Sequence, residues 1–279
     1  TLFASVMGMS GLTLGWIKAG TQGGTQATAV GLILAVITSV LLLVLLLAYG
    51  LKFIAYRGAV LAESQHPVKL NFFAAIPIGF ILVATVWSGS HPAVAEPIWW
   101  VGISAMLIAT LLTMSSWVNH SHYQINHLNP AWFIPVVGNI LVPIAGMRLG
   151  HIEVSWFFFS VGLVFWVILT ALVLNRLIFH DALPARMRPT LFILLAPPAV
   201  GFVAYLNLNG MALDALARVL YFTALFLACL LAANALQFLK LPFFISGWAY
   251  SFPMAAMTVA SFEMGHLSGL VGYTALAWA

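Results

Sequence analysis

The stretch ISGWAYSFPMAAM, residues Ile245–Met257, places Pro253 inside an apolar segment without a charged residue. A proline in a helix interior removes a backbone hydrogen bond and clashes with the carbonyl four residues earlier, at a cost of about 3 kcal/mol or more. A kink directly after Phe252 therefore needs a structural or functional role that offsets this cost, and the rest of the chain indicates which role it is.

The composition of the chain indicates a helical membrane protein. Of its 279 residues, 63% are hydrophobic and 6% are charged, against roughly 25% charged in soluble domains. A globule of this size cannot bury that much apolar surface. Residues 30–51 alone are long enough to cross a bilayer, and such unbroken runs exclude the alternating strands of a membrane β-barrel. The small net charge of +4 lies in the loops and gives no sign of nucleic-acid binding.

Ten apolar segments follow one another along the chain, and we expect each to be a transmembrane helix. The last is too short to span a bilayer, so we expect residues to be missing at both ends and residues 1–279 to form a single transmembrane domain with truncated terminal helices. The segments are 2–16, 28–51, 70–88, 97–119, 130–147, 152–178, 189–207, 212–236, 242–262 and 267–279.

Prolines recur in alternate segments. The third, fifth, seventh and ninth segments begin at or just after a proline and contain at least one more, whereas the second, fourth, sixth and eighth contain none inside. This regularity predicts a repeated helical hairpin with one kinked and one straight helix, five hairpins in all. The opening prolines are Pro67, Pro130, Pro189 and Pro242, and the internal ones are Pro77, Pro135, Pro143, Pro197, Pro198 and Pro253.

The kinked odd segments are expected to form an inner layer around a pore, and the straight even ones an outer layer that faces lipid. Irregular backbone is tolerated at membrane depth where it is buried in protein or lines a cavity. Glycines of the inner segments would help to shape the pore, and a hydrophobic ring would close it. The kink would then aim Phe252 inward as a plug. The alternative to a pore function, for any single proline and for Phe252 itself, is a simple role in helix packing. The glycines are Gly79, Gly138, Gly201 and Gly247.

Lysine and arginine counts in the loops predict the orientation. Loops that follow even segments carry seven, and the opposite side carries three, which places the even-to-odd loops and both termini in the cytoplasm. The seven are Lys52, Arg57, Lys69, Arg176, Arg186, Arg188 and Lys240, and the three are Lys18, Arg148 and Arg218.

The sequence offers little for catalysis or for a cofactor. All acidic, basic and histidine residues fall at segment ends or in loops, which disfavours a bis-histidine haem, a buried proton relay or a charged site at the membrane midplane. His120, His122 and His127 cluster, but no cysteine or acid stands near them to complete a zinc site. We therefore expect no enzyme activity, no cofactor and no metal.

Four stretches resemble the tellurite-resistance/dicarboxylate transporter family, which contains bacterial TehA and the plant slow anion channels. They are HPVKLNFFAAIPIGF, HLNPAWFIPVVGN, LLAPPAVGFVAYLN with DALARVLY, and GWAYSFPMAAM. The resemblance implies ten helices in five hairpins around a central pore, a homotrimer, and passive flux of small inorganic anions such as chloride and nitrate. It also implies that Phe252 occludes the pore.

The first segment departs from that family. Bacterial relatives usually carry a proline there after an aromatic–glycine pair, whereas this chain has Ala4 and Val6 at the matching places. Gly8 and Gly11 would supply flexibility instead. Anion preference rests on the resemblance alone.

The resulting prediction is an anion channel of a bacterial inner membrane, closed at rest by Phe252. The first alternative is a secondary carrier that exports a dicarboxylate, sulfite or tellurite-type oxyanion, which proton dependence would reveal. The second is a membrane redox or metal-handling protein.

Overall fold

The computed structural model describes residues 2–22, 25–64, 70–119 and 123–279. Throughout these ranges the regular structure is helical, with no strand. Six helical stretches within them are long and apolar enough to cross a membrane, and Pro130–Gly146 is a shorter apolar stretch. The six are Gln26–Ala55, Leu70–Trp87, Pro92–Asn119, Ile152–Phe179, Ala185–Leu208 and Ala215–Ala233.

Four long helices correspond to the even apolar segments and lie on the outside. In the most apolar window of each, only 22–33% of the residues are buried. Leucine, valine and phenylalanine side chains therefore face outward over most of their length, which is the pattern of helices in contact with lipid. They are α2 (Thr25–Ala55), α5 (Pro92–Asn119), α8 (Ile152–Phe179) and α10 (Ala215–Ala233).

Five inner segments correspond to the odd apolar segments, and most of them combine 3₁₀ and α turns. In two of them, Leu70–Trp87 and Ala185–Leu208, 67% and 72% of the residues in the most apolar window are buried. The inner segments are α1 (Ala4–Gly20); η1 (Leu70–Ala74) with α4 (Ala75–Trp87); η3 (Pro130–Trp132), α6 (Phe133–Val137), η4 (Gly138–Leu141) and α7 (Val142–Gly146); η5 (Ala185–Leu194) with α9 (Ala196–Leu208); and η6 (Ile245–Gly247) with α12 (Trp248–Ser268).

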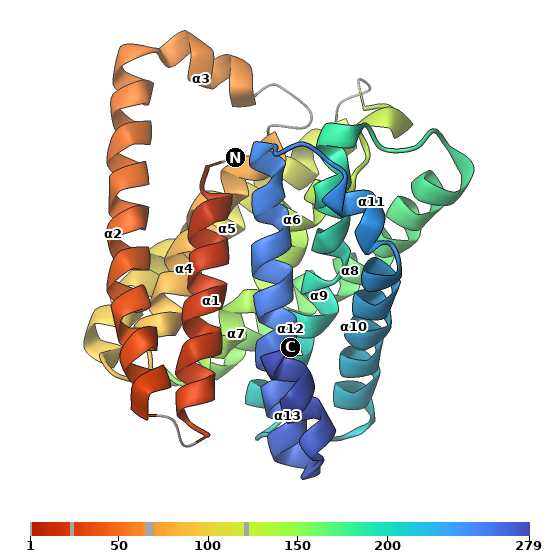
Figure 1. The fold of residues 1–279 in the computed structure, drawn as a ribbon. Coiled ribbons are helices and arrows are strands. Elements are labelled where there is room, and N and C mark those ends of the chain that lie inside the picture. Colours follow the sequence, from red (N-terminus) through yellow and green to blue (C-terminus); the bar gives the residue numbers. More distant parts are fainter. Residues whose placement is uncertain (1, 23–24, 65–69, 120–122) are drawn as a thin grey trace.

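The inner segments form a closed ring. α1 contacts α4, α4 contacts α7, α7 contacts α9, α9 contacts α12, and α12 returns to α1. Figure 1 shows α1 and α12 side by side, with α2 and α10 on opposite flanks. Each outer helix packs against the inner segment before it, and α13 (Val271–Trp278) packs against α12. Two short helices, α3 (Arg57–Ser64) and α11 (Ala235–Leu239), were not predicted.

Side chains stabilise the irregular backbone of the fifth segment. The Thr110 hydroxyl, on α5, donates to the Pro135 carbonyl at 2.7 Å. Asn139 donates from Nδ2 to the Thr110 hydroxyl at 2.9 Å and to the Val136 carbonyl at 2.7 Å. The outer helix thus partners polar groups that proline and 3₁₀ geometry would otherwise leave exposed to an apolar interior.

Several predicted segment boundaries were wrong, most clearly those of α5, α1 and α12. α5 begins at Pro92, so it carries Pro97 in its interior, and the even helices are not all free of internal proline. α1 continues to Gly20 and includes Lys18, and α12 continues to Ser268 and includes Glu263. The prediction ended segments at charged residues, whereas α12 ends where Gly269 adopts a left-handed φ of 71°.

Candidate functional site

Two cavities lie inside the ring of inner segments. Cavity A has a volume of about 80 Å³ and is lined by all five inner segments, among them by Met7, Ile78, Val137, Pro197 and Ala249. Every residue that lines it belongs to an inner segment and almost all are apolar. Cavity A lies at the end of the ring where the inner segments begin.

Cavity B has a volume of about 300 Å³ and lies toward the end of the ring where the inner segments finish. It too is lined only by inner segments and the residues that directly follow them, among them Leu14, Thr85, Ile144 and Val203. Neither cavity has a lining residue from α2, α5, α8 or α10. The ring alone therefore encloses both spaces.

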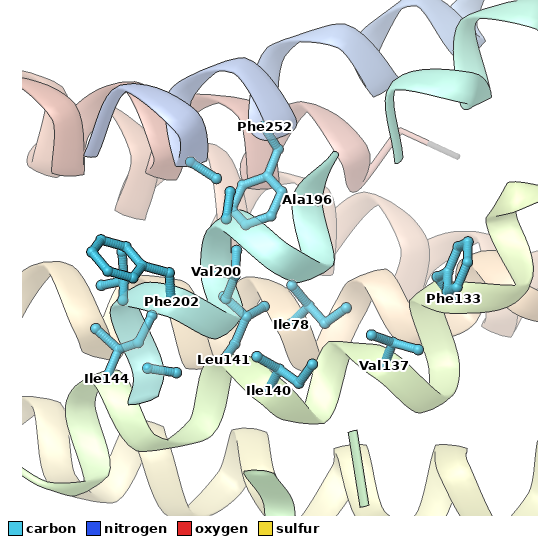
Figure 2. Close-up of a cluster of buried hydrophobic side chains, with 14 of the residues drawn as sticks. Ile78, Phe133, Val137, Ile140, Leu141, Ile144, Ala196, Val200, Phe202 and Phe252 are labelled. Carbon is cyan, nitrogen blue, oxygen red and sulfur yellow. The ribbon is translucent and has the colours of Figure 1, made fainter. Parts of the chain in front are cut away.

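Phe252 lies where the two cavities meet. Its side chain lines both of them, as do Leu141 and Val200. The residue is 8% exposed, and Figure 2 shows its ring directed from α12 toward the turn of α9 that carries Ala196 and Val200. Three apolar residues, from η4, α9 and α12, thus line both cavities.

The backbone around Phe252 is set by Pro253 and by α1. Pro253 lies inside α12 and deprives the Ala249 carbonyl, beside cavity A, of its helical partner. On the other side, α1 approaches closely because Gly11 has no side chain. A Cβ at Gly11 would lie 2.9 Å from the Ala255 Cβ and 3.2 Å from Phe252 Cδ2.

Five of the residues predicted to line or kink a pore border a cavity. Phe252, Pro253, Pro197 and Gly138 line cavity A, and Gly11 and Phe252 line cavity B. Pro197 occupies the first turn of α9, where a missing N–H costs little.

The other eight predicted residues line neither cavity. Gly8 packs against Ser251 on α12, Gly79 against Leu42 on α2, and Gly201 faces Leu220 on α10, so these glycines serve helix contacts. The prolines among them are buried within their segments. The eight are Pro77, Pro135, Pro143, Pro198, Gly8, Gly79, Gly201 and Gly247.

Sequence reasoning missed a group of charges in cavity B. Lys18, Arg148 and Glu263 all line it, and the Lys18 ammonium lies 2.7 Å from Glu263 Oε1. The three are far apart in the sequence and each was assigned to a segment end. The one sequence signal for this group was that all three residues were expected near the ends of odd segments, on the same side of the membrane.

The histidine cluster gives no metal site in the described residues. His120 and His122, together with Lys69 and Pro67, lie outside them. His127 uses Nδ1 to accept a hydrogen bond from the Gln124 N–H at 3.2 Å, and no group of three potential ligands occurs elsewhere in the described chain.

Comparison with known proteins gives consistent relatives. The chain is 28% identical over 233 residues to the tellurite resistance protein TehA homolog of Haemophilus influenzae, which covers 83% of this chain and 71% of that protein. It is 28% identical over 234 residues to the uncharacterized transporter MJ0576 of Methanocaldococcus jannaschii, and the match covers 76% of this chain and 67% of that protein.

A plant channel matches as well. The chain is 29% identical over 218 residues to the S-type anion channel SLAH3 of Arabidopsis thaliana; the match covers 76% of this chain but 34% of that channel. The sequence profile of a family described as voltage-dependent anion channel, SLAC1, matches residues 1–279. Together with the apolar helices, this identifies a multi-pass membrane protein that belongs to the SLAC1 family of anion channels.

Proposed function

We propose that this chain is a channel for small monovalent anions such as chloride and nitrate, closed by Phe252. The observation that carries the proposal is the meeting of cavities A and B at that ring. An ion would enter one cavity, pass the constriction of Phe252, Leu141 and Val200, and leave by the other. No energy source is coupled to this movement.

The proposed architecture is a single membrane domain of ten transmembrane helices in five hairpins, with the inner segments around the pore. The contacts of each inner segment with the outer helix that follows it support the hairpins. The loop charges support cytoplasmic termini in a bacterial inner membrane, with cavity A toward the cytoplasm. A homotrimer follows from the family resemblance, and its subunits would meet through outer apolar faces.

The decisive experiment replaces the plug. In planar bilayers or oocytes, Phe252→Ala should raise chloride and nitrate conductance by a large factor, because it removes the aromatic ring that separates the cavities. Unitary currents whose reversal potential follows the anion gradient would identify a channel. An unchanged current with protein at the membrane would refute the plug.

A matched control is available on the same helix. Phe262 is 1% exposed and lines neither cavity A nor cavity B; it packs against Trp278. Phe262→Ala removes a similar buried volume and should leave the conductance at the level of the unmodified protein. Equal increases in the two variants would mean that the current reports disrupted packing.

One observation favours the carrier alternative. The Lys18–Glu263 ion pair places two charged side chains beside a cavity, and charged residues that line an internal pathway are common in proton-coupled transporters. Vesicle flux of a dicarboxylate, sulfite or tellurite that saturates, depends on a pH gradient and lacks unitary currents would establish a carrier. Flux that follows only the anion gradient supports the channel.

A further inference from the structure

We propose that Lys18 and Arg148 form an anion-binding subsite in cavity B, and that Glu263 limits its affinity by neutralising Lys18. The subsite lies between the mouth of the cavity and Phe252, and its ligand class is a small inorganic anion. The inference rests on the proposed function, because it assigns a waiting position on the same pathway.

Arg148 is the positively charged residue of cavity B that is available to bind an anion. It follows α7, its side chain is exposed to the cavity, and it takes part in no salt bridge within the described residues. Among the described residues, its side chain makes one hydrogen bond, a long one of 3.5 Å from Nη1 to the Ser88 hydroxyl. A guanidinium carries five N–H donors in a planar fork, so most of its donors remain free for an anion, and the fork suits a planar oxyanion such as nitrate.

Lys18 is held by Glu263. The ammonium lies 2.7 Å from Oε1, and Glu263 is 7% exposed. Its second oxygen, Oε2, is buried and has no hydrogen-bond partner in the described part of the chain. One carboxylate oxygen therefore pairs with Lys18, and the other lies in the wall of the cavity. The negative charge of Glu263 also acts on Arg148.

The charge balance of cavity B explains why an anion needs these cations. Two positive groups and one carboxylate leave a net charge of one positive, and the remaining lining residues are neutral. α1 ends at Gly20 and α4 at Trp87, so both direct their C-terminal, partially negative ends toward this side. Helix C-termini attract cations and repel anions. Without Arg148 the mouth of the pathway would therefore disfavour the proposed substrate.

Glu263 is consequently the group that sets the strength of the subsite. Removing its charge would free Lys18 and raise the net charge from one to two positive. A unit charge a few ångströms from the ligand in a partly solvated cavity changes anion affinity by roughly threefold to tenfold. The same change is expected with opposite sign when Arg148 is neutralised.

The test measures binding without current. Bromide is titrated into the purified protein, and its binding is followed by the line broadening of the bromide-81 NMR signal. Glu263→Gln should lower the half-saturating bromide concentration by about threefold to tenfold, and Arg148→Gln should raise it by a similar factor. Arg148→Lys should restore most of the affinity, because it keeps the charge.

A double variant separates the roles of the two basic residues. Lys18→Gln alone should weaken bromide binding by about threefold to tenfold, because it leaves the Glu263 carboxylate unpaired and lowers the net charge of cavity B from one positive to zero. In the Glu263→Gln background the same change should cancel the gain, because the net charge returns to one positive. The matched control is Glu153→Gln, which removes an exposed carboxylate of α8 near the same end and should have no effect.

Bromide affinity that is unchanged in Glu263→Gln, or equally changed in Glu153→Gln, would overturn the proposal. These outcomes are distinct from failure of the channel proposal. If Phe252→Ala carries no current while Glu263→Gln still tightens bromide binding, the subsite stands and the channel does not.

Discussion

Gly11→Ala tests whether α1 holds the Phe252 ring in the pathway. The new methyl would lie 2.9 Å from the Ala255 Cβ and 3.2 Å from Phe252 Cδ2, whereas carbon atoms pack best at about 3.5–4.0 Å. α1 and α12 must therefore separate or the ring must rotate. Overpacking of this kind costs about 1–3 kcal/mol.

The strain would fall on the proposed closed arrangement, because that arrangement includes the contact between the new methyl and the Phe252 ring. If about 1.4 kcal/mol of it is relieved when Phe252 leaves the constriction, the open population rises about tenfold. The methyl itself takes up little of cavity B, which has about 300 Å³. We expect Gly11→Ala to raise anion conductance in the direction of Phe252→Ala, by a smaller factor.

The assay is single-channel recording of purified protein in planar bilayers, compared with Gly15→Ala. Gly15 lies one turn further along α1, and a Cβ there would have Thr258 Cγ2 at 3.9 Å as its nearest neighbour. Gly15→Ala should therefore behave like the unmodified protein. In the Phe252→Ala background, Gly11→Ala should lose most of its effect, because the ring contact is gone. Equal open probabilities for the two glycine variants, or a full effect without the ring, would refute the reasoning.

Three further predictions concern stability. Gly162→Ala should lower the thermal midpoint of the protein in nanodiscs, because the new Cβ would lie 2.8 Å from the Ile140 backbone nitrogen. Gly201→Ala should be tolerated with normal conductance, because its nearest neighbour, Leu220 Cδ2, would lie at 3.6 Å. Similar thermal midpoints for the two variants would contradict the packing account. Val6→Pro should yield a monodisperse folded protein by size-exclusion chromatography, because it removes only the first-turn hydrogen bond from the Val6 N–H to the Phe3 carbonyl; loss of expression would count against it. A hydrogen bond from the Ala217 backbone N–H lowers the pKa of Asp214 below 3.8, so its stabilisation of the start of α10 is present above that pH and lost as the pH falls through the lowered pKa. The thermal midpoint should therefore fall more between pH 5 and pH 3 in the unmodified protein than in Asp214→Asn, and identical pH profiles would show that this carboxylate has no such role.

Hydropathy and proline spacing were sufficient to locate the apolar segments and to distinguish the inner, kinked segments from the outer, straight ones. The reason is local: a proline alters the hydrogen bonding of its own turn, and a long run of leucine and valine needs an apolar environment wherever it lies. The burial contrast between Leu70–Trp87 at 67% and Gln26–Ala55 at 22% agrees with the expected inner and outer layers. The boundaries were less accurate, because a charge does not end a helix, as Lys18 in α1 shows.

The sequence by itself determined a multi-pass helical protein and singled out the Phe252–Pro253 pair. Only the tertiary structure decided which small residues serve the cavities and which serve helix contacts, since Gly11 and Gly8 differ by less than one turn of the same helix yet only Gly11 borders cavity B. It also decided that Lys18, Arg148 and Glu263 line one cavity. Their proximity depends on how α1, α7 and α12 close the ring, a long-range arrangement that spacing along the chain does not encode.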